Sequence, residues 1–199
     1  MNPIVKLLAN QTDDVVCCRM NRDKIHTTII AVDTAFKTKT MDDYSVFAVW
    51  GRSVKAVYLM DVYRAKLEYP DLLAKAKELY RIWNPIRMLV EDKASGQSLV
   101  QDLRRLLIPV IAVAADIDRY RRVSAVTGIM ESGVCYFPES APWFNDFLDE
   151  HIAFPNGEHD DQVDTTSIAL AYFKASMAGG SGGKINSEKK EEGSKWRDR

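Results

Sequence analysis

The amino-acid sequence predicts an α/β fold in which a single mixed sheet is flanked by helices. Two observations favour this class. Between residues 27 and 63, three apolar segments rich in β-branched and aromatic residues follow one another at short spacing, as in an antiparallel meander. Beyond residue 70, segments with helical spacing alternate with short apolar runs, as where helices connect parallel strands. With 199 residues, of which 46% are hydrophobic, the chain can bury a sizeable core without disulfide or metal support.

The first half of the predicted sheet is a meander of three strands. We expect them at residues 27–32 (TTIIAV), 44–50 (YSVFAVW) and 54–63 (VKAVYLMDVY). Asp33 follows the first strand, and the polar segment TAFKTKTMDD leads to the second. Residues 51–53, Gly-Arg-Ser, are expected to form the turn to the third strand.

The second half alternates helices with strands. Apolar residues recur at helical spacing over residues 72–83, and Asn84-Pro85 is expected to end that helix. The remaining elements are expected as strands at 86–90 and 110–114, a helix opened by Ser95-Gly96, helices at 118–132, around 143–148 and at 160–176, and an extended piece at 134–137. Gly133 has the position of a C-cap.

The two ends of the chain differ in composition from the middle. Residues 1–26 are polar and lack a sustained period, which is typical of a linker or of the remnant of an upstream region. Residues 178–199 contain GGSGG followed by charged residues, and this composition predicts a flexible tail. The sequence therefore predicts one domain, at residues 27–177.

Composition excludes several classes of protein. No apolar stretch approaches the roughly 20 residues that cross a bilayer, and no signal peptide opens the chain. Lys and Arg total 27 and Asp and Glu total 28, a net charge of −1, which is not the basic footprint usual in nucleic-acid binders. The three cysteines have no C-x-x-C spacing, so structural zinc and a disulfide framework are not expected and a cytoplasmic location is favoured.

Acidic residues follow two predicted strands and open the last long helix. Asp33 comes directly after the first strand, Glu91-Asp92 follow the strand at 86–90, and Asp160, Asp161 and Asp164 lie at the helix start in HDDQVD. Ligands of open α/β sheets collect just beyond strand ends, and residues three or four apart on a helix share a face. Three or four carboxylates are therefore expected to converge. Because adjacent side chains on a strand point to opposite faces, only one of Glu91 and Asp92 can join this group, and we expect it to be Glu91.

Converging carboxylates predict a metal site. Without a cation they would repel one another and raise one another's pKa values. Oxygen ligands with no Cys or His cluster favour Mg²⁺ or Mn²⁺. Two such ions, about 3.5–4 Å apart, support phosphodiester hydrolysis without a protein nucleophile. Taken singly, each acid also fits a simpler role, because Asp33 could cap a turn, Glu91-Asp92 could cap a helix, and the late acids could favour a helix dipole.

The order of these acids resembles the ribonuclease-H-like arrangement of metal-ion nucleases. More narrowly, the chain resembles the C-terminal nuclease domain of the large terminase subunit of tailed bacteriophages. The matching stretches are IIAVDTAFKTKTMDDYSVFAVW, IRMLVEDKASGQSLVQDLR, DRYRRVSAVTGIMESGVCYFP and HDDQVDTTSIALAYF. The resemblance implies that Asp33, Glu91 and one or more of Asp160, Asp161 and Asp164 are catalytic and hold two metal ions.

The resemblance also implies a function and partners. The expected activity is cleavage of concatemeric double-stranded DNA during viral genome packaging, in a bacterial host, with an upstream ATPase domain, a small terminase subunit and a portal as partners. Large terminases carry an ATPase motor, but this sequence has no G-x-x-x-x-G-K-[ST] phosphate loop. We therefore expect an isolated or truncated nuclease domain without ATPase activity.

Basic residues near the acids are candidates for DNA contact. Lys93 could neutralise a scissile phosphate or balance its acidic neighbours, and Arg119, Arg121 and Arg122 could contact DNA phosphates or form a solvated helix face. Three other functions remain open from the sequence: a junction resolvase, a nuclease of RNA–DNA hybrids, and a non-catalytic docking module of the packaging motor.

Overall fold

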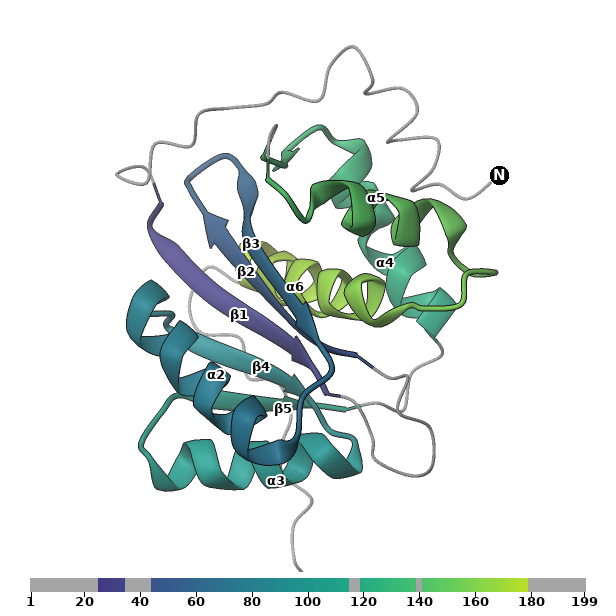
Figure 1. Cartoon of the computed structure of the whole chain (residues 1–199). Coiled ribbons are helices and arrows are strands. Elements are labelled where there is room, and N and C mark those ends of the chain that lie inside the picture. The colour runs from purple at the N-terminus through teal and green to yellow at the C-terminus, as the bar shows by residue number, and fades with distance from the viewer. Residues whose placement is uncertain (1–24, 35–43, 115–118, 139–140, 179–199) are drawn as a thin grey trace, which may run out of the picture.

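A six-stranded mixed sheet forms the centre of the molecule (Figure 1). The computed structural model describes residues 25–34, 44–114, 119–138 and 141–178, excluding the side chains of 119–121 and 177–178. The strands are β1 (Thr27–Asp33), β2 (Ser45–Arg52), β3 (Val57–Ala65), β4 (Arg87–Glu91), β5 (Val110–Val113) and β6 (Cys135–Tyr136). Their order is β5-β4-β1-β2-β3-β6, which places β1, the strand that carries Asp33, inside the sheet.

Strand directions also match the prediction. β1, β2 and β3 form the antiparallel meander, and β4 runs parallel to β1 on its other side. β5 is parallel to β4, and the short β6 pairs in parallel with β3. The carboxyl ends of β1 and β4 therefore lie at the same edge of the sheet.

Helices cover both faces of the sheet (Figure 1). They are α2 (Tyr69–Trp83), α3 (Ala94–Arg105), α4 (Arg119–Glu131), α5 (Phe144–Ala153) and α6 (Asp161–Ala178). α2 and α3 pack on one face, and α6 crosses the other, with α4 and α5 against it. Both layers are required because the strands are apolar on both sides.

Alternation along β1 shows how the two layers are specified. Ile29 and Ala31 pack in the core shared with α4, α5 and α6, whereas Ile30 and Val32 pack in the core shared with α2 and α3. All four side chains are fully buried. Because successive side chains point to opposite faces, the sequence IIAV fills two cores at once.

The β2–β3 hairpin differs from the prediction. Gly51 lies within β2, paired with Tyr58, and the turn is formed by residues 53–56 instead of 51–53. The Ser53 N–H donates to the Ala56 carbonyl at 2.9 Å, and the Ser53 hydroxyl accepts from the Ala56 N–H at 3.1 Å. A Cβ added at position 51 would lie 2.7 Å from the Met60 sulfur, so the glycine lies in a closely packed part of the sheet and not in the turn.

Other element limits shift by one or a few residues. Asp33 and Glu91 are the last residues of β1 and β4, where the sequence suggested positions just beyond the strands. Most of the predicted linker at 1–26 and tail at 178–199 lies outside the described residues, so both stay predictions. Within the described part of the chain, no helix combines the length and apolar character that a membrane crossing needs.

Candidate metal centre

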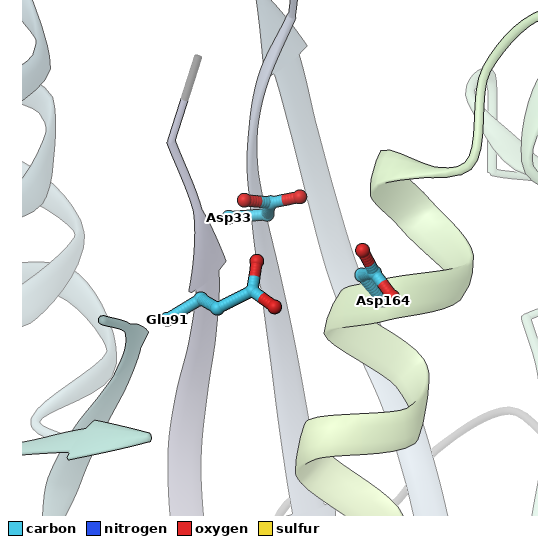
Figure 2. Close-up of side chains that lie close together, drawn as sticks. All are labelled: Asp33, Glu91 and Asp164. Carbon is cyan, nitrogen blue, oxygen red and sulfur yellow. The ribbon is translucent and has the colours of Figure 1, made fainter. Parts of the chain in front are cut away.

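The register of the sheet brings Asp33 and Glu91 together. Val32 of β1 pairs with Val90 of the parallel strand β4, so the next residues along the two strands are Asp33 and Glu91. Alternation then carries both side chains to the face that holds Ala31 and is covered by α6. Figure 2 shows both carboxylates directed toward α6.

The third carboxylate, Asp164, comes from the first turns of α6. Ile168, four residues later on the same helix face, is buried against the sheet, so this face of α6 turns Asp164 toward the strand ends. Asp33, Glu91 and Asp164 each offer an oxygen, and these oxygens lie within 4.8 Å of one another. The three residues are only 2%, 1% and 1% exposed. We call them the acidic triad.

The other predicted acids lie outside the triad. Asp160 precedes α6, and its backbone carbonyl accepts the Asp164 N–H at 2.9 Å. Asp161 begins the helix but does not join the group of converging ligand oxygens. Asp92 is exposed and its N–H donates to the Val113 carbonyl at 2.7 Å, extending the pairing of β4 with β5. The sequence left the choice open among the late acids and favoured Glu91 over Asp92. In the structure, Glu91 and Asp164 are the residues that lie close to Asp33.

Lys93 lies against all three members of the triad. Its Nζ forms ion pairs with Glu91 Oε2, with Asp33 Oδ1 at 3.3 Å and with Asp164 Oδ2 at 3.9 Å. A tight turn positions it, because the Lys93 N–H donates back to the Glu91 carbonyl at 2.9 Å. The lysine is thus a counter-ion of the triad, with 28% of its side chain still exposed.

Arg122 of α4 is a second counter-ion. Its Nη1 donates to Glu91 Oε1 and its Nη2 donates to Asp164 Oδ1, both at 2.8 Å. The side chain is 10% exposed and points into the triad. The sequence offered Arg122 as a possible DNA contact and gave no sign that it pairs with carboxylates 31 and 42 residues away. The side chains of Arg119 and Arg121 lie outside the described residues.

The triad has unusual electrostatics. Burial raises the pKa of Asp33 well above its ordinary value, and Glu91 and Asp164 raise it further, against the opposing effect of Lys93. Burial also acts to raise the pKa of Glu91, but hydrogen bonds and charges from Lys93 and Arg122 outweigh it, and that pKa is lowered. Burial acts to lower the pKa of Lys93, yet the surrounding carboxylates raise it. The site therefore strongly favours cations.

The start of α3 is built around the triad. A Cβ added at Gly96 would lie 2.0 Å from the Glu91 carbonyl oxygen, so only glycine allows the helix to approach the end of β4 this closely. The Ser95 and Thr34 hydroxyls lie 2.7 Å apart, and the Ser95 hydroxyl donates to the Thr34 carbonyl at 3.2 Å. These contacts join the ends of β1 and β4 to one helix.

The start of α6 is held by Glu150 of α5. Its Oε1 accepts the Gln162 N–H at 2.6 Å and its Oε2 accepts from Gln162 Nε2 at 2.7 Å. A carboxylate here satisfies an N–H group at the helix start and favours its dipole. From the sequence, Asp160 and Asp161 are the acids expected to favour the dipole of this helix. No local pattern indicates that Glu150, twelve residues before Gln162, binds the helix start.

The donor set of the triad fits a hard divalent cation. Carboxylate oxygens from three elements, buried and close together, match the ligands that Mg²⁺ and Mn²⁺ take in proteins. A buried group of three carboxylates is costly unless a cation compensates it. Asp33, Glu91 and Asp164 are therefore the residues that would hold a metal ion.

Several solved structures share this fold. The large terminase nuclease from thermophilic phage G20c has a TM-score of 0.63 and 18% identity, over 86% of this chain and 98% of that one. Related structures of it contain bound zinc or bound magnesium. The human cytomegalovirus terminase nuclease domain has a TM-score of 0.60 and 13% identity, covering 82% of this chain and 92% of that one.

A longer protein is similar as well. The large terminase of a second thermophilic bacteriophage has a TM-score of 0.55 and 12% identity, over 80% of this chain and 45% of that chain. The present chain thus spans less than half the length of that terminase. No curated protein matched the sequence. The model of the terminase RNaseH-like domain family, however, matches residues 30–173, which is most of the chain and includes the whole triad. The chain therefore belongs to the terminase RNaseH-like domain family.

Proposed function

We propose that this domain is a metal-dependent endonuclease that cuts concatemeric double-stranded DNA during viral genome packaging. The observation that carries the proposal is the acidic triad, in which carboxylates from β1, β4 and α6 converge at one edge of the sheet. Membership of the terminase RNaseH-like family supports a nuclease rather than another use of this site.

The residues of the site have distinct roles in this proposal. Asp33, Glu91 and Asp164 bind Mg²⁺ or Mn²⁺, two ions as in the family resemblance. Bound ions of this kind activate water and stabilise the charge that develops on a phosphodiester. Lys93, partly exposed above the triad, neutralises a negatively charged DNA phosphate that approaches it. The surrounding core keeps the carboxylates rigid and excludes bulk water from their inner side.

The wider assembly is part of the same proposal. The domain acts in the cytoplasm of a bacterial host, beside an ATPase domain that supplies movement along DNA. A small terminase subunit and a portal complete the machine. The likeness to part of a phage large terminase supports the ATPase partner, because this chain covers only 45% of that protein.

A nicking assay tests the activity. Supercoiled plasmid incubated with the protein is expected to become nicked or linear with Mg²⁺ or Mn²⁺ and to stay intact with EDTA. Asp164→Asn is expected to abolish cutting, whereas Asp92→Asn, the matched change at the exposed acid next to Glu91, should leave it intact. Cutting that survives EDTA or Asp164→Asn would refute the proposal.

The choice of substrate separates the remaining alternatives. Equal amounts of linear duplex, four-way junction and RNA–DNA hybrid are offered under the conditions of the nicking assay. Preference for duplex supports the packaging nuclease, and preference for junction or hybrid would replace it with a resolvase or a hybrid nuclease. A protein that binds metal but cuts none of them would be a docking module.

A further inference from the structure

Arg122 occupies one carboxylate oxygen on each of two members of the triad. It bridges Glu91 Oε1 and Asp164 Oδ1 with two hydrogen bonds of 2.8 Å, while Lys93 pairs with the other oxygen of each residue. Between them, the two cations reach every carboxylate of the triad. A divalent ion that binds Glu91 and Asp164 must therefore share or take oxygens that already have a positively charged partner.

The charges explain why sharing is unfavourable. With all five groups ionised, the three carboxylates, Lys93 and Arg122 have a net charge of −1, since the two cations offset two of the three negative charges. A divalent ion added to this buried group would make it net positive and would lie beside a guanidinium at close range. Like charges in a poorly solvated site repel strongly, so one of the two resident cations has to move away.

Local structure indicates that Arg122 is the cation that moves. The backbone of Lys93 is held beside Glu91 by a turn in which the Lys93 N–H donates to the Glu91 carbonyl, so this lysine belongs to the same chain segment as its partner. Arg122 reaches the site from a different element, α4, at the end of a long side chain. Its Nε is buried and has no hydrogen-bond partner among the described residues, so the inward position leaves one of its donors unsatisfied. A buried donor without a partner weakens the hold of that position.

We propose that Arg122 is an internal counter-ion that competes with the divalent metal for Glu91 and Asp164. In the metal-free protein it compensates the buried carboxylates and keeps the strand ends and α6 together. Metal binding displaces it, so Arg122 sets the metal concentration at which the site fills. The inference rests on the proposed function only in assuming that the triad binds metal.

Calorimetric titration of the whole chain with Mn²⁺ alone, without DNA, tests this competition. Arg122→Met keeps a long apolar side chain but removes the charge and the hydrogen bonds. It is expected to bind Mn²⁺ about tenfold more tightly than the parent and to melt at a lower temperature in EDTA. Arg105→Met is the matched control, because Arg105 is exposed at the far end of α3 and pairs only with Asp102 among the described ion pairs. Its Mn²⁺ affinity should equal that of the parent.

A second measurement avoids dependence on a variant that could unfold. In the parent protein, the ¹⁵N signal of Arg122 Nε, assigned with Arg122→Lys, should shift as Mg²⁺ is added, with the same midpoint as the backbone amide of Asp164. An Arg122 signal that stays fixed while Mg²⁺ saturates the site would overturn the inference. So would a folded Arg122→Met protein with unchanged or weaker Mn²⁺ affinity.

These outcomes separate the inference from the proposed function. If Arg122→Met tightens Mn²⁺ binding but the parent protein cuts no nucleic acid, the nuclease proposal is wrong and the competition stands. If the parent protein cuts DNA but Arg122→Met binds Mn²⁺ with the affinity of the parent, the competition is wrong and the nuclease proposal stands.

Discussion

Asp33 and Glu91 end neighbouring strands and face the same helix, yet their pKa values move in opposite directions. Burial and two neighbouring carboxylates raise the pKa of Asp33. Glu91 accepts hydrogen bonds from Arg122 and contacts Lys93 closely, which lowers its pKa in spite of burial. Ionised Asp33 therefore destabilises the metal-free protein, whereas ionised Glu91 stabilises it.

Removing these two charges should therefore have opposite effects on stability in EDTA. Asp33→Asn is expected to raise the free energy of unfolding, because it removes a poorly compensated buried charge. Glu91→Gln is expected to lower it by about 1–3 kcal/mol, since charged hydrogen bonds are lost. Urea unfolding at neutral pH measures both. Both variants should also lose metal-dependent nicking. If the two changes shift stability in the same direction, the ion pairs of Glu91 do not have the role assigned here.

Asp161 provides a test of which acid of α6 matters. Burial, with help from Glu150 and Asp160, raises its pKa to about 6. Its ionised form is thus unfavourable at neutral pH, and Asp161→Asn is expected to raise the melting temperature while nicking continues. Asp164→Asn should instead abolish nicking. Loss of nicking in a stable Asp161→Asn protein would add Asp161 to the metal ligands.

The sequence indicated the acids of the site and offered Lys93 as a possible counter-ion, but it gave no sign of the ion pairs of Arg122. Asp33 and Glu91 could be found because each closes an apolar strand, and alternation favoured Glu91 over Asp92. The choice among the late acids depends on how α6 sits on the sheet, which no local pattern contains. Arg122 could not be assigned to the site for the same reason, because its partners lie in β4 and α6, far away in the chain.

At the scale of elements, the contact of α3 with the end of β4 depends on Gly96. The glycine is buried, and a methyl group there would overlap the Glu91 carbonyl oxygen at 2.0 Å. Backbone cannot yield as a flexible side chain does, so α3 or the end of β4 would have to move. A shift of either element would displace the Glu91 carboxylate from the triad.

Two glycine substitutions separate this packing effect from helix propensity. Gly96→Ala is expected to lower stability by roughly 1–3 kcal/mol, as overpacking does, and to weaken Mn²⁺ binding. Gly128→Ala in α4 is the control, since a Cβ there would meet nothing within 4 Å. It should raise stability by about 0.5–1 kcal/mol without changing Mn²⁺ affinity. Thermal melts and metal titration of both variants give the answer. Unchanged metal binding in Gly96→Ala would show that the contact is not needed for the site.

Local sequence patterns predict some parts of the fold and not others. The strands and most of the helices follow from periods of two and 3.6 residues, which are local. The sequence predicts the hairpin between β2 and β3 too early, because Gly-Arg-Ser at residues 51–53 is typical of a turn. The close approach of Gly51 to Met60 across the hairpin is visible only once the strands are paired.

At the scale of the whole molecule, the helical layer over the sheet contains a buried histidine. His151 of α5 is fully buried, its Nδ1 donates to the Phe147 carbonyl at 2.7 Å, and its Nε2 lies 3.0 Å from the Thr166 hydroxyl of α6. Burial lowers its pKa from 6.5 to about 4. Because it joins α5 to α6, protonation of this imidazole affects the helix that carries Asp164.

Stability should therefore depend on pH through His151. Between pH 6.5 and about 4, the unfolded chain binds a proton at this residue that the native protein does not. The contribution of neutral His151 is complete above pH 6.5 and is lost as the pH falls toward 4. It amounts to about 3 kcal/mol at most. Urea unfolding at several pH values measures the loss.

Other acids titrate in the same range, so a variant is needed to isolate the histidine. His151→Gln stays neutral at every pH and removes only this group from the titration. The difference in unfolding free energy between the parent and His151→Gln should shrink as the pH falls from 6.5 to 4. A difference that is constant with pH would mean that His151 titrates normally in the native protein.

The position of Asp164 on the last helix of the fold has a consequence for biosynthesis. The ribosome makes β1 and β4 first, and more than seventy residues separate Glu91 from Asp164 along the chain. A nascent chain that has not yet released α6 carries only two of the three carboxylates and lacks one helix of the layer that covers them. Under the proposed function, the site therefore gains its full set of metal-binding carboxylates only once translation has passed α6.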